Sequence, residues 1–204
     1  MGLGSRPPLS RDVIVAEARS IIVEEGLDAV SVRHLAQRLG VTASALYVHV
    51  ADKDDLLRAV TAGEIDALLA RFTPRDEDPV ATLRHFCETY VDWATANAAL
   101  YRTMFLYPPR GRSADAGEPG LPLSGPGFAV PYAAVAEAVD TGRFRPQRPL
   151  VALLTLWTAV HGLAEVLLLG LPTDEAERAA FTAHVIDTVI AGLQAPEPGQ
   201  GASA

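Results

Sequence analysis

The chain has 204 residues, of which 49% are hydrophobic and 21% are charged, and its formal net charge is −8 at pH 7. This composition excludes a chain that is disordered as a whole, and the length suits one or two domains. The acidic balance argues against a nucleic-acid coat protein or a polybasic membrane binder, but it permits a basic face on an acidic body. A single cysteine, Cys87, excludes an internal disulfide framework and favours a reducing compartment.

The charge is divided unevenly along the chain. Residues 1–53 hold six Arg or Lys and six Asp or Glu, whereas residues 54–204 hold eleven and nineteen. The whole net charge of −8 therefore lies after residue 53, and Lys53 is the only lysine. No apolar run typical of a secretion signal is visible near the N-terminus, so we expect a cytoplasmic protein.

Helical periodicity dominates the sequence, and no segment alternates apolar and polar residues over any length, which predicts an all-α fold. The first helix is predicted over residues 10–25, where Ser10 can cap the start and Gly26 can end it. Further helices are predicted over residues 31–39, 43–49, 52–72, 78–97, 100–107, 128–141, 149–169 and 174–193. Ser31 opens the second helix, Thr42 can cap the third, and Thr173 or Asp174 can cap the last, where Asp174 and Glu177 have the spacing of a capping box in acidic form.

Two kinds of segment interrupt this helical pattern. Between residues 108 and 127, ten of twenty residues are proline or glycine, which predicts either a mobile loop that acts as a lid or plain disorder. Residues 1–8 and 195–204 also have the composition of disordered tails.

Three short helices separated by Gly26 and Gly40 are the pattern that a helix-turn-helix needs. The second helix braces the third, a tight turn at Gly40 reorients the chain, and the third helix enters the major groove. A glycine is favoured in that turn because it adopts a positive φ at little cost.

The residues of this segment match the motifs of a known protein family. The stretch SVRHLAQRLGVTASALYVHVADKDDLL, residues 31–57, resembles the DNA-binding segment of the tetracycline-repressor (TetR) family of bacterial regulators. The matching features are LAxxLGV at 35–41, LYxHV at 46–50 and KxxLL at 53–57. A weaker likeness follows in LWTAVHGLAEVLLLG, residues 156–170, which resembles the Trp-x-x-x-His-Gly helix of one TetR subgroup.

Several of these positions suit contacts with DNA. Tyr47 and His49 follow the turn, where a phenol and an imidazole can reach phosphate oxygens, and Lys53 lies in the first turn of the next helix. Arg33 is the best base reader, since arginine binds guanine O6 and N7 bidentately. The predicted DNA contacts are Arg33, Thr42, Ala43, Ser44, Ala45, Tyr47, His49 and Lys53. The alternatives are a core aromatic at Tyr47, a half-buried capping group at His49 and surface charges at Arg33 and Lys53.

The third helix lacks the long polar side chains that usually read bases. Thr42, Ala43, Ser44 and Ala45 offer only two hydroxyls and two methyl groups, where glutamine, arginine or asparagine would specify bases. Small residues permit close approach and contact with thymine methyl groups, but they discriminate weakly. An alternative function is therefore a small-molecule-binding or scaffolding dimer whose helix-turn-helix is degenerate and does not bind DNA.

Residues 150–171 form an apolar segment of 22 residues in which Glu165 is the only formal charge. Its length is near that of a transmembrane helix, but such a helix would place His161 and Glu165 in lipid at a cost of about 3 kcal/mol for the charge. We favour a helix buried between its own domain and a second subunit. The last helix carries a matching stripe, with Ala180, His184, Asp187 and Ile190 near one line and Phe181, Val185 and Val189 beside it. TetR-like proteins dimerise through such helices, and the resemblance implies the same here.

The same helical body is where an effector is expected to bind. The candidate ligand-binding residues, which combine aromatic surface with a few polar tips, are Trp93, Phe105, Tyr107, Trp157, His161 and Glu165, with Tyr90 nearby. The alternative is that Trp157 and His161 simply pack in the core or the dimer seam. His161 and Glu165 have metal-ligand spacing but no third ligand, so no metal is expected.

No nucleophile elbow, phosphate loop or HExxH motif is present, so neither catalysis nor a cofactor is expected. These observations together predict an all-α DNA-binding regulator. Its helix-turn-helix domain is expected over residues 1–55, and an antiparallel helical effector-binding and dimerisation domain over residues 56–195, with a tail at 196–204. We expect a homodimer joined through its last two helices, which binds operator DNA and a small apolar effector and does not enter a membrane.

Overall fold

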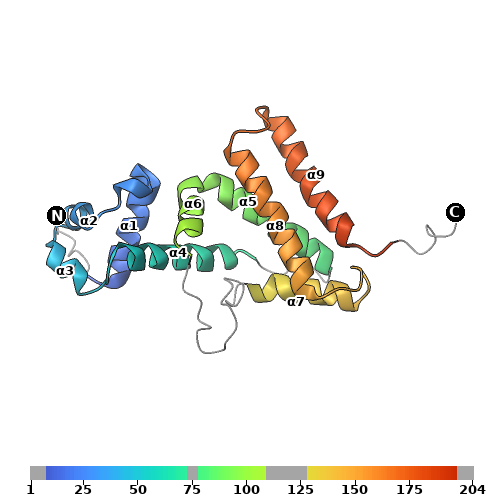
Figure 1. The fold of residues 1–204 in the computed structure, drawn as a ribbon, viewed down its shortest axis with the longest axis horizontal. Helices are drawn as coiled ribbons and strands as arrows, with labels where there is room; N and C mark the ends of the chain where they lie inside the picture. Colours follow the sequence, from blue (N-terminus) through green and yellow to red (C-terminus); the bar gives the residue numbers. More distant parts are fainter. Residues whose placement is uncertain (1–7, 73–77, 109–127, 197–204) are drawn as a thin grey trace, which may run out of the picture. The chain divides into compact units, whose positions relative to one another are not determined.

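The computed structural model describes residues 8–72, 78–108 and 128–196. Over these ranges the chain is all-α, as predicted, and the helices follow one another as Figure 1 shows. Their bounds are α1 Arg11–Glu25, α2 Val32–Leu39, α3 Ala43–Tyr47, α4 Lys53–Leu69, α5 Pro79–Ala96, α6 Ala98–Leu106, α7 Ala129–Asp140, α8 Pro149–Leu168 and α9 Glu175–Leu193. The predicted loop at 108–127, except for Pro108, and most of both predicted tails lie outside the described residues.

The predicted capping residues begin their helices. Ser10, Ser31 and Thr42 each accept a hydrogen bond from a backbone N–H three residues on, at 3.2 to 3.3 Å. Asp174 accepts from the N–H of Glu177 at 3.0 Å, so the acidic capping pair also forms. Each bond satisfies one of the backbone donors that the first turn of a helix leaves free.

Some helix ends differ from the prediction. α3 ends at Tyr47 rather than His49 because the chain tightens there, and the N–H of His49 bonds to the carbonyl of Leu46 at 2.9 Å. α4 ends at Leu69, three residues before Phe72, in a similarly tight last turn. A short 3₁₀ turn over Leu27–Ala29, which periodicity does not reveal, follows α1.

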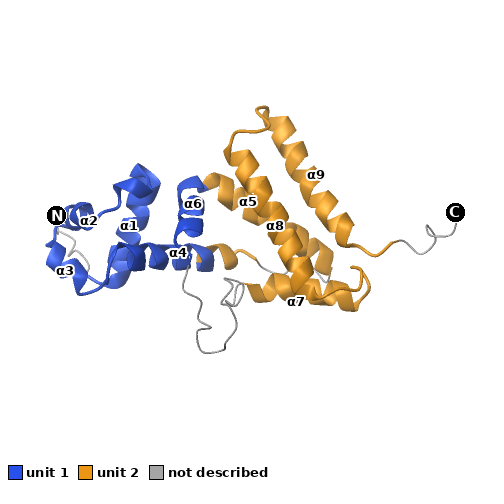
Figure 2. Cartoon of the chain, viewed as in Figure 1, with its two compact units in different colours: residues 1–66, 97–122 blue, residues 67–96, 123–204 orange. Residues whose placement is uncertain are grey.

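The chain forms two compact units, which Figure 2 shows in different colours. The first contains α1 to α3, α4 as far as Asp66, and α6; the second contains the end of α4, α5 and α7 to α9. The predicted domain boundary at residue 55 falls inside α4, which is one continuous helix. The division into residues 1–55 and 56–195 stays a prediction.

The core of the first unit is built on the buried face of α1. The fully buried residues of this helix, which follow helical spacing, are Ile14, Ala18, Ile21 and Ile22. They face α2, the 3₁₀ turn and α6. α2 contributes Leu35 and Leu39, which are 1% and 5% exposed. This apolar seam sets the orientation of α2, and therefore of the turn that follows it.

In the second unit, α5 contacts α7, α8 and α9, and α8 also contacts α7 and α9. The side of α8 that faces these helices carries a continuous apolar stripe, which consists of Ala152, Leu153, Leu156, Val160, Leu163, Ala164 and Leu167. Among the described helices, α8 alone has the length and composition to cross a membrane, and 39% of that apolar stretch is buried within the protein. Its packing is that of a core helix with one uncovered side.

Gly40 is a position where the turn before α3 depends on glycine, because its φ of 64° lies in the left-handed region. We predict that Gly40→Ala lowers the free energy of unfolding of the first unit by about 1–2 kcal/mol, the cost of that conformation for an L side chain. Urea unfolding measures it.

Gly63→Ala is the matched control. Gly63 lies inside α4, and an added Cβ there meets nothing within 4 Å. This substitution should stabilise the helix by about 0.5–1 kcal/mol. If both substitutions shift stability in the same direction, the strain assigned to Gly40 is wrong.

Candidate nucleic-acid interface

The turn between α2 and α3 is closed by backbone hydrogen bonds. The N–H of Gly40 donates to the carbonyl of Gln37 at 3.2 Å, and the N–H of Val41 donates to that of Ala36 at 3.0 Å. These bonds satisfy carbonyls that the end of α2 would otherwise leave free. With Thr42 capping α3 directly afterwards, the angle between the two helices is set by a turn of three residues.

One side of α3 is anchored and the other faces solvent. Leu46 is 1% exposed, and Val50, just after the helix, is 4% exposed. The exposed side chains of this segment are Thr42, Ala43, Ser44, Tyr47 and Val48. Ala45 is half-buried, so it is the member of the predicted contact set at 42–45 that turns partly inward.

The exposed face of α2 carries two side chains that suit base recognition. Arg33 and Gln37 are both exposed and lie four residues apart, so they share one face of the helix. Within the described part of the chain, neither side chain has a recorded hydrogen bond or ion pair. Sequence reasoning missed Gln37, although its spacing from Arg33 was a usable signal. A glutamine amide binds adenine bidentately, as an arginine binds guanine.

Tyr47, His49 and Lys53 lie around the end of α3 and the start of α4. Tyr47 is 56% exposed, which excludes a core aromatic at this position. His49 and Lys53 are half-buried. Lys53 is the first residue of α4, directly after Asp52, whose carboxylate accepts from the N–H of Asp55 at 2.7 Å.

Arg11 connects α1 to the loop that carries these residues. Its guanidinium donates to the carbonyl of His49 at 2.8 Å and to both carboxylate oxygens of Asp55 at 2.8 and 2.9 Å. The same carboxylate accepts from the N–H of Ala51 at 3.1 Å. The hydrogen bond with Asp55 raises the pKa of Arg11. One planar cation therefore joins α1 both to the segment between α3 and α4, at His49, and to the first turn of α4, at Asp55.

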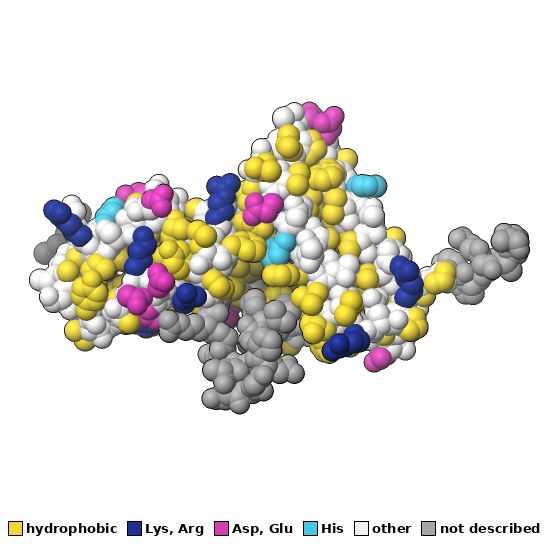
Figure 3. Space-filling view, in the orientation of Figure 1, with side chains coloured by type: hydrophobic (Ala, Val, Ile, Leu, Met, Phe, Trp, Pro, Cys, Tyr) yellow, Lys and Arg dark blue, Asp and Glu magenta, His cyan; other side chains and the backbone are white. Residues whose placement is uncertain are grey.

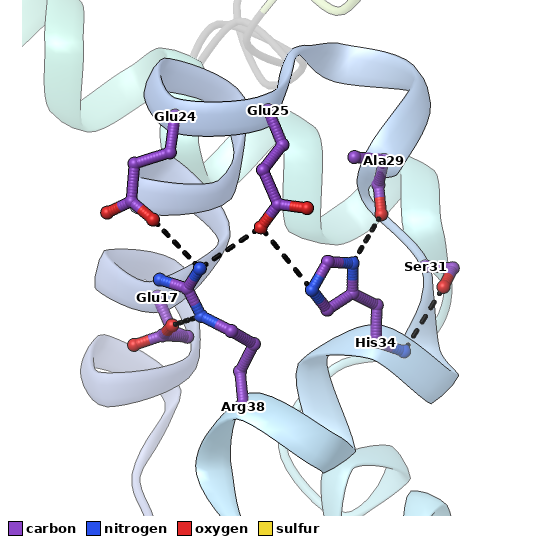
Figure 4. A network of polar contacts seen from close by, with 7 residues as sticks. All are labelled: Glu17, Glu24, Glu25, Ala29, Ser31, His34 and Arg38. Atoms are coloured by element: carbon purple, nitrogen blue, oxygen red, sulfur yellow. Dashed lines mark hydrogen bonds and ion pairs between the residues drawn. The ribbon is translucent and has the colours of Figure 1, made fainter.

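Arg38 performs a similar role between α2 and α1, as Figure 4 shows. Its guanidinium lies 2.6 Å from Glu17, 2.8 Å from Glu24 and 3.0 Å from Glu25. The hydrogen bonds that Arg38 donates to Glu24 and Glu17 raise the pKa of Arg38, and Arg38 in turn lowers the pKa of Glu24. His34 also approaches Glu25, at 3.4 Å.

These ion pairs distinguish the basic side chains that hold the first unit together from those that have no recorded carboxylate partner. Among the basic residues described up to position 53, Arg11, Arg19 and Arg38 all pair with carboxylates of the first unit. Arg33 and Lys53 have no such recorded partner within the described ranges. The positive charge available to a ligand on this helix-turn-helix is therefore that of Arg33 and Lys53.

Two family profiles match this chain. The profile described as "Bacterial regulatory proteins, tetR family" matches residues 14–60, and "Tetracyclin repressor-like, C-terminal domain" matches residues 83–189, more than half of the chain.

The chain belongs to the tetracycline-repressor family. It is therefore a DNA-binding transcriptional regulator, and the helix-turn-helix of the first unit is the part that the N-terminal profile covers.

Relatives of known sequence agree with this assignment. An uncharacterized HTH-type transcriptional regulator of Mycobacterium tuberculosis is 27% identical over 190 residues, which cover 91% of this chain and 82% of the relative. The tetracycline repressor protein class C of Escherichia coli is 34% identical over 70 residues, or 34% of this chain and 32% of that protein.

Solved structures share the fold. A protein of unknown function from Rhodococcus sp. RHA1 aligns with a TM-score of 0.72 and 22% identity, covering 95% of this chain and all of that one. TetR from Acinetobacter baumannii aligns at 0.67 and 24% identity, covering 91% and 96%. RolR, solved with resorcinol, aligns at 0.65 and 14% identity, covering 92% and 89%.

The predicted effector-binding residues of this TetR-family regulator are divided between the two units. Phe105 and Tyr107 belong to the first unit, where Phe105 packs against Tyr101 with ring centroids 5.0 Å apart. Trp93, Trp157, His161 and Glu165 belong to the second unit. Trp93 is buried and Glu165 is exposed, so these two side chains lie in unlike environments.

His161 is the centre of an aromatic cluster in the second unit. Its ring centroid lies 3.9 Å from that of Trp157 and 4.9 Å from that of Tyr90. The Tyr90 hydroxyl shares a hydrogen bond with Nδ1 of His161. Burial lowers the pKa of His161 to about 4, so the imidazole is neutral at pH 7.

A separate hollow of about 380 Å³ lies among α5, α8 and α9. Its polar lining comes mainly from Glu88 and Asp92 of α5 and from Glu175 and Arg178 of α9. None of the six predicted effector residues lines it.

The outer side of α8 and α9 carries an apolar hollow of about 520 Å³, which is lined by Ala159, Phe181, His184, Val185, Thr188 and Val189. Two members of the stripe predicted on α9 have other roles. Asp187 pairs with Arg84 of α5 at 2.6 Å, and Ile190 is 3% exposed within its own unit. The uncovered stripe therefore follows Phe181, Val185 and Val189.

We predict that Arg11→Ala weakens DNA binding about tenfold, or ~1.4 kcal/mol, because the segment between α3 and α4 loses a shared anchor. The pair with Asp55 is partly exposed, so the free energy of unfolding should fall by no more than about 1 kcal/mol. Fluorescence anisotropy with a labelled duplex, together with urea unfolding, separates the two effects.

Two further variants serve as controls for this prediction. Arg11→Lys keeps the charge but loses the bidentate geometry, and should recover only part of the affinity. Arg143→Ala removes an exposed arginine that pairs with Asp78 in the second unit, and it should leave DNA binding unchanged. Equal effects of Arg11→Ala and Arg143→Ala would contradict a positioning role for Arg11.

His161 makes stability depend on pH. Between its folded pKa of about 4 and the ordinary value of 6.5, the unfolded chain binds more protons, so acid favours unfolding. From pH 7 to 4 the wild type should lose about 2 kcal/mol more stability than His161→Gln, less than the full shift implies because the ring is half-buried. Urea unfolding across this range measures the difference, and parallel pH profiles would disprove it.

Proposed function

We propose that this TetR-family regulator is a ligand-responsive repressor, which binds a palindromic operator as a homodimer and is released by a small, largely apolar molecule. The observation that carries the proposal is the pair of available cations, Arg33 and Lys53, on an otherwise ion-paired helix-turn-helix.

Within the operator, Arg33 is expected to read guanine, and Thr42, Ala43, Ser44 and Ala45 to line the groove. Tyr47, His49 and Lys53 contact phosphates on either side of it. The exposure of Arg33 and Tyr47 supports this division, as does the position of Lys53 at the start of α4. The half-buried Ala45 is the weakest member of the set.

Dimerisation supplies what one short recognition helix lacks. A single helix binds weakly, whereas two helices about 34–36 Å apart read both halves of a palindrome. The uncovered stripe of Phe181, Val185 and Val189, beside Ala159 of α8, supports a dimer that buries this side of the last two helices.

The effector is expected to bind in the second unit around Trp157 and His161. The neutral imidazole offers a hydrogen bond without a charge, and the indole offers apolar area, which together suit a largely apolar molecule. RolR, a fold neighbour solved with resorcinol, supports a small effector. Trp93, Phe105, Tyr107 and Glu165 stay candidates, although the two units divide them.

α4 is the element expected to transmit the effector signal, because it runs unbroken from Lys53 to Leu69 and belongs to both units. An effector shifts the equilibrium only if it binds the released conformation more tightly than the DNA-bound one. We expect a protein that acts in the cytoplasm and performs no catalysis. Cys87 is not available as a nucleophile, because burial raises the pKa of its thiol to about 12.

Gel-shift titration with the DNA upstream of the chain's own gene, over a range of salt concentrations, tests the proposal. Binding should weaken steeply as salt rises, because phosphate contacts release counterions. Lys53→Ala should reduce the slope of log K against log salt by about 1 and weaken all sequences alike.

Arg33→Ala should instead relax base preference, by about 1–3 kcal/mol at one base pair of each half-site. Site selection on random duplexes with both variants measures the difference. An unchanged base preference of Arg33→Ala would remove Arg33 from base recognition. A wild-type chain that binds no duplex would favour the scaffolding alternative.

A further inference from the structure

The outward face of α3 carries apolar side chains where DNA-reading helices usually carry long polar ones. Val48 is 80% exposed, the largest value among the exposed large hydrophobic side chains of the described residues. Ala43 is exposed on the same short segment. Figure 3 shows hydrophobic side chains gathered on the surface at the end of the first unit where Figure 1 labels α3.

The hydroxyls of this segment add little hydrogen-bonding capacity. Thr42 uses its Oγ1 to accept from the N–H of Ala45 at 3.3 Å, which begins the helix. The remaining groups are the Thr42 O–H donor, the hydroxyl of Ser44 and the phenol of Tyr47. A surface with so few donors and acceptors cannot distinguish base pairs mainly by hydrogen bonds.

The major groove offers one apolar group that such a surface can recognise, the C5-methyl group of thymine. We infer that α3 reads thymine methyl groups, and that Val48 is the residue that determines this specificity. The inference rests on the proposed contact between α3 and the operator. Val48 is not among the contacts predicted from the sequence.

The packing of Val48 agrees with this role. It caps the C-terminal end of α3 with helical φ and ψ of −70° and −26°, next to the exposed Tyr47. Leu46 and Val50, on either side, are the residues that anchor the segment. Val48 is therefore held in a fixed place without contributing to the core, which is the arrangement that a contact residue needs.

The two helices carry groups that suit different bases. Arg33 and Gln37 on α2 carry the groups that bind guanine and adenine bidentately, whereas α3 carries the groups that contact methyls. Each operator half-site should therefore contain thymines at the positions that face α3.

Substitution of deoxyuridine for thymidine tests the inference. Duplexes are first selected from a random library with the full chain and then resynthesised with deoxyuridine replacing one thymidine at a time. This change keeps base pairing and every hydrogen-bonding group, and removes one methyl group. Affinity should fall about fourfold for at least one thymine in each half-site, the factor expected for one buried methyl or methylene group.

Val48→Ala links that loss to one side chain. The variant should bind the thymine duplex about fourfold more weakly, and deoxyuridine at the position facing Val48 should then have no further effect. Its salt dependence should match the wild type, because an apolar contact releases no counterions. Val23→Ala is the matched control, since Val23 is a 55% exposed valine on α1 and should affect neither affinity nor thymine preference.

The outcomes distinguish this inference from the proposed function. If selected duplexes bind equally well with thymidine and deoxyuridine at every position, methyl recognition is wrong while DNA binding stands. A changed salt slope for Val48→Ala would assign Val48 to a backbone contact and also overturn the inference. If no duplex is selected at all, both the proposed function and this inference fail.

Discussion

A helix of five residues has too few internal hydrogen bonds to be stable alone, so the DNA-facing surface depends on what holds α3 from outside. Leu46 supplies the apolar anchor on one side, and the left-handed Gly40 directs the chain into the helix. Arg11 then holds the segment that leaves it, through the carbonyl of His49 and the carboxylate of Asp55. The position of α3 therefore depends on α1, on the turn before the helix and on the buried side of the helix itself.

The basic residues of the first unit fall into two groups, those that pair with carboxylates and those without a recorded carboxylate partner in the described residues. Arg38 is placed among three carboxylates of α1, and Arg19 pairs with the buried Glu64. These cations hold helices together, whereas Arg33 and Lys53 have no recorded ion pair within the described ranges. The net charge of −8, which at first argued against nucleic acid, belongs entirely to residues 54–204. Repulsion of that acidic part by phosphate favours approach of the neutral helix-turn-helix.

In the second unit, one apolar helix serves two surfaces. The stripe of α8 from Ala152 to Leu167 packs inside the unit, while its outer side, with Phe181 and Val185 of α9, stays uncovered. The high hydropathy of α8, which permits a membrane-spanning interpretation of the sequence, has a simpler cause in these two apolar faces. His161, on the same helix, adds little polarity, because burial beside Tyr90 and Trp157 lowers the pKa of its ring and keeps it neutral.

The sequence by itself determined the helix starts at Ser10, Ser31 and Thr42, the turn at Gly40 and the likeness to TetR regulators, and it limited the start of the last helix to Thr173 or Asp174. These depend on a few adjacent residues, whose chemistry acts over one helical turn. Only the tertiary structure decided which side chains are available. It directed Val48 and Gln37 outward and Trp93 inward, and it divided Phe105 and Tyr107 from Trp157 and His161. Exposure and proximity depend on which helices pack together, and contacts between distant segments leave no local pattern in a single sequence.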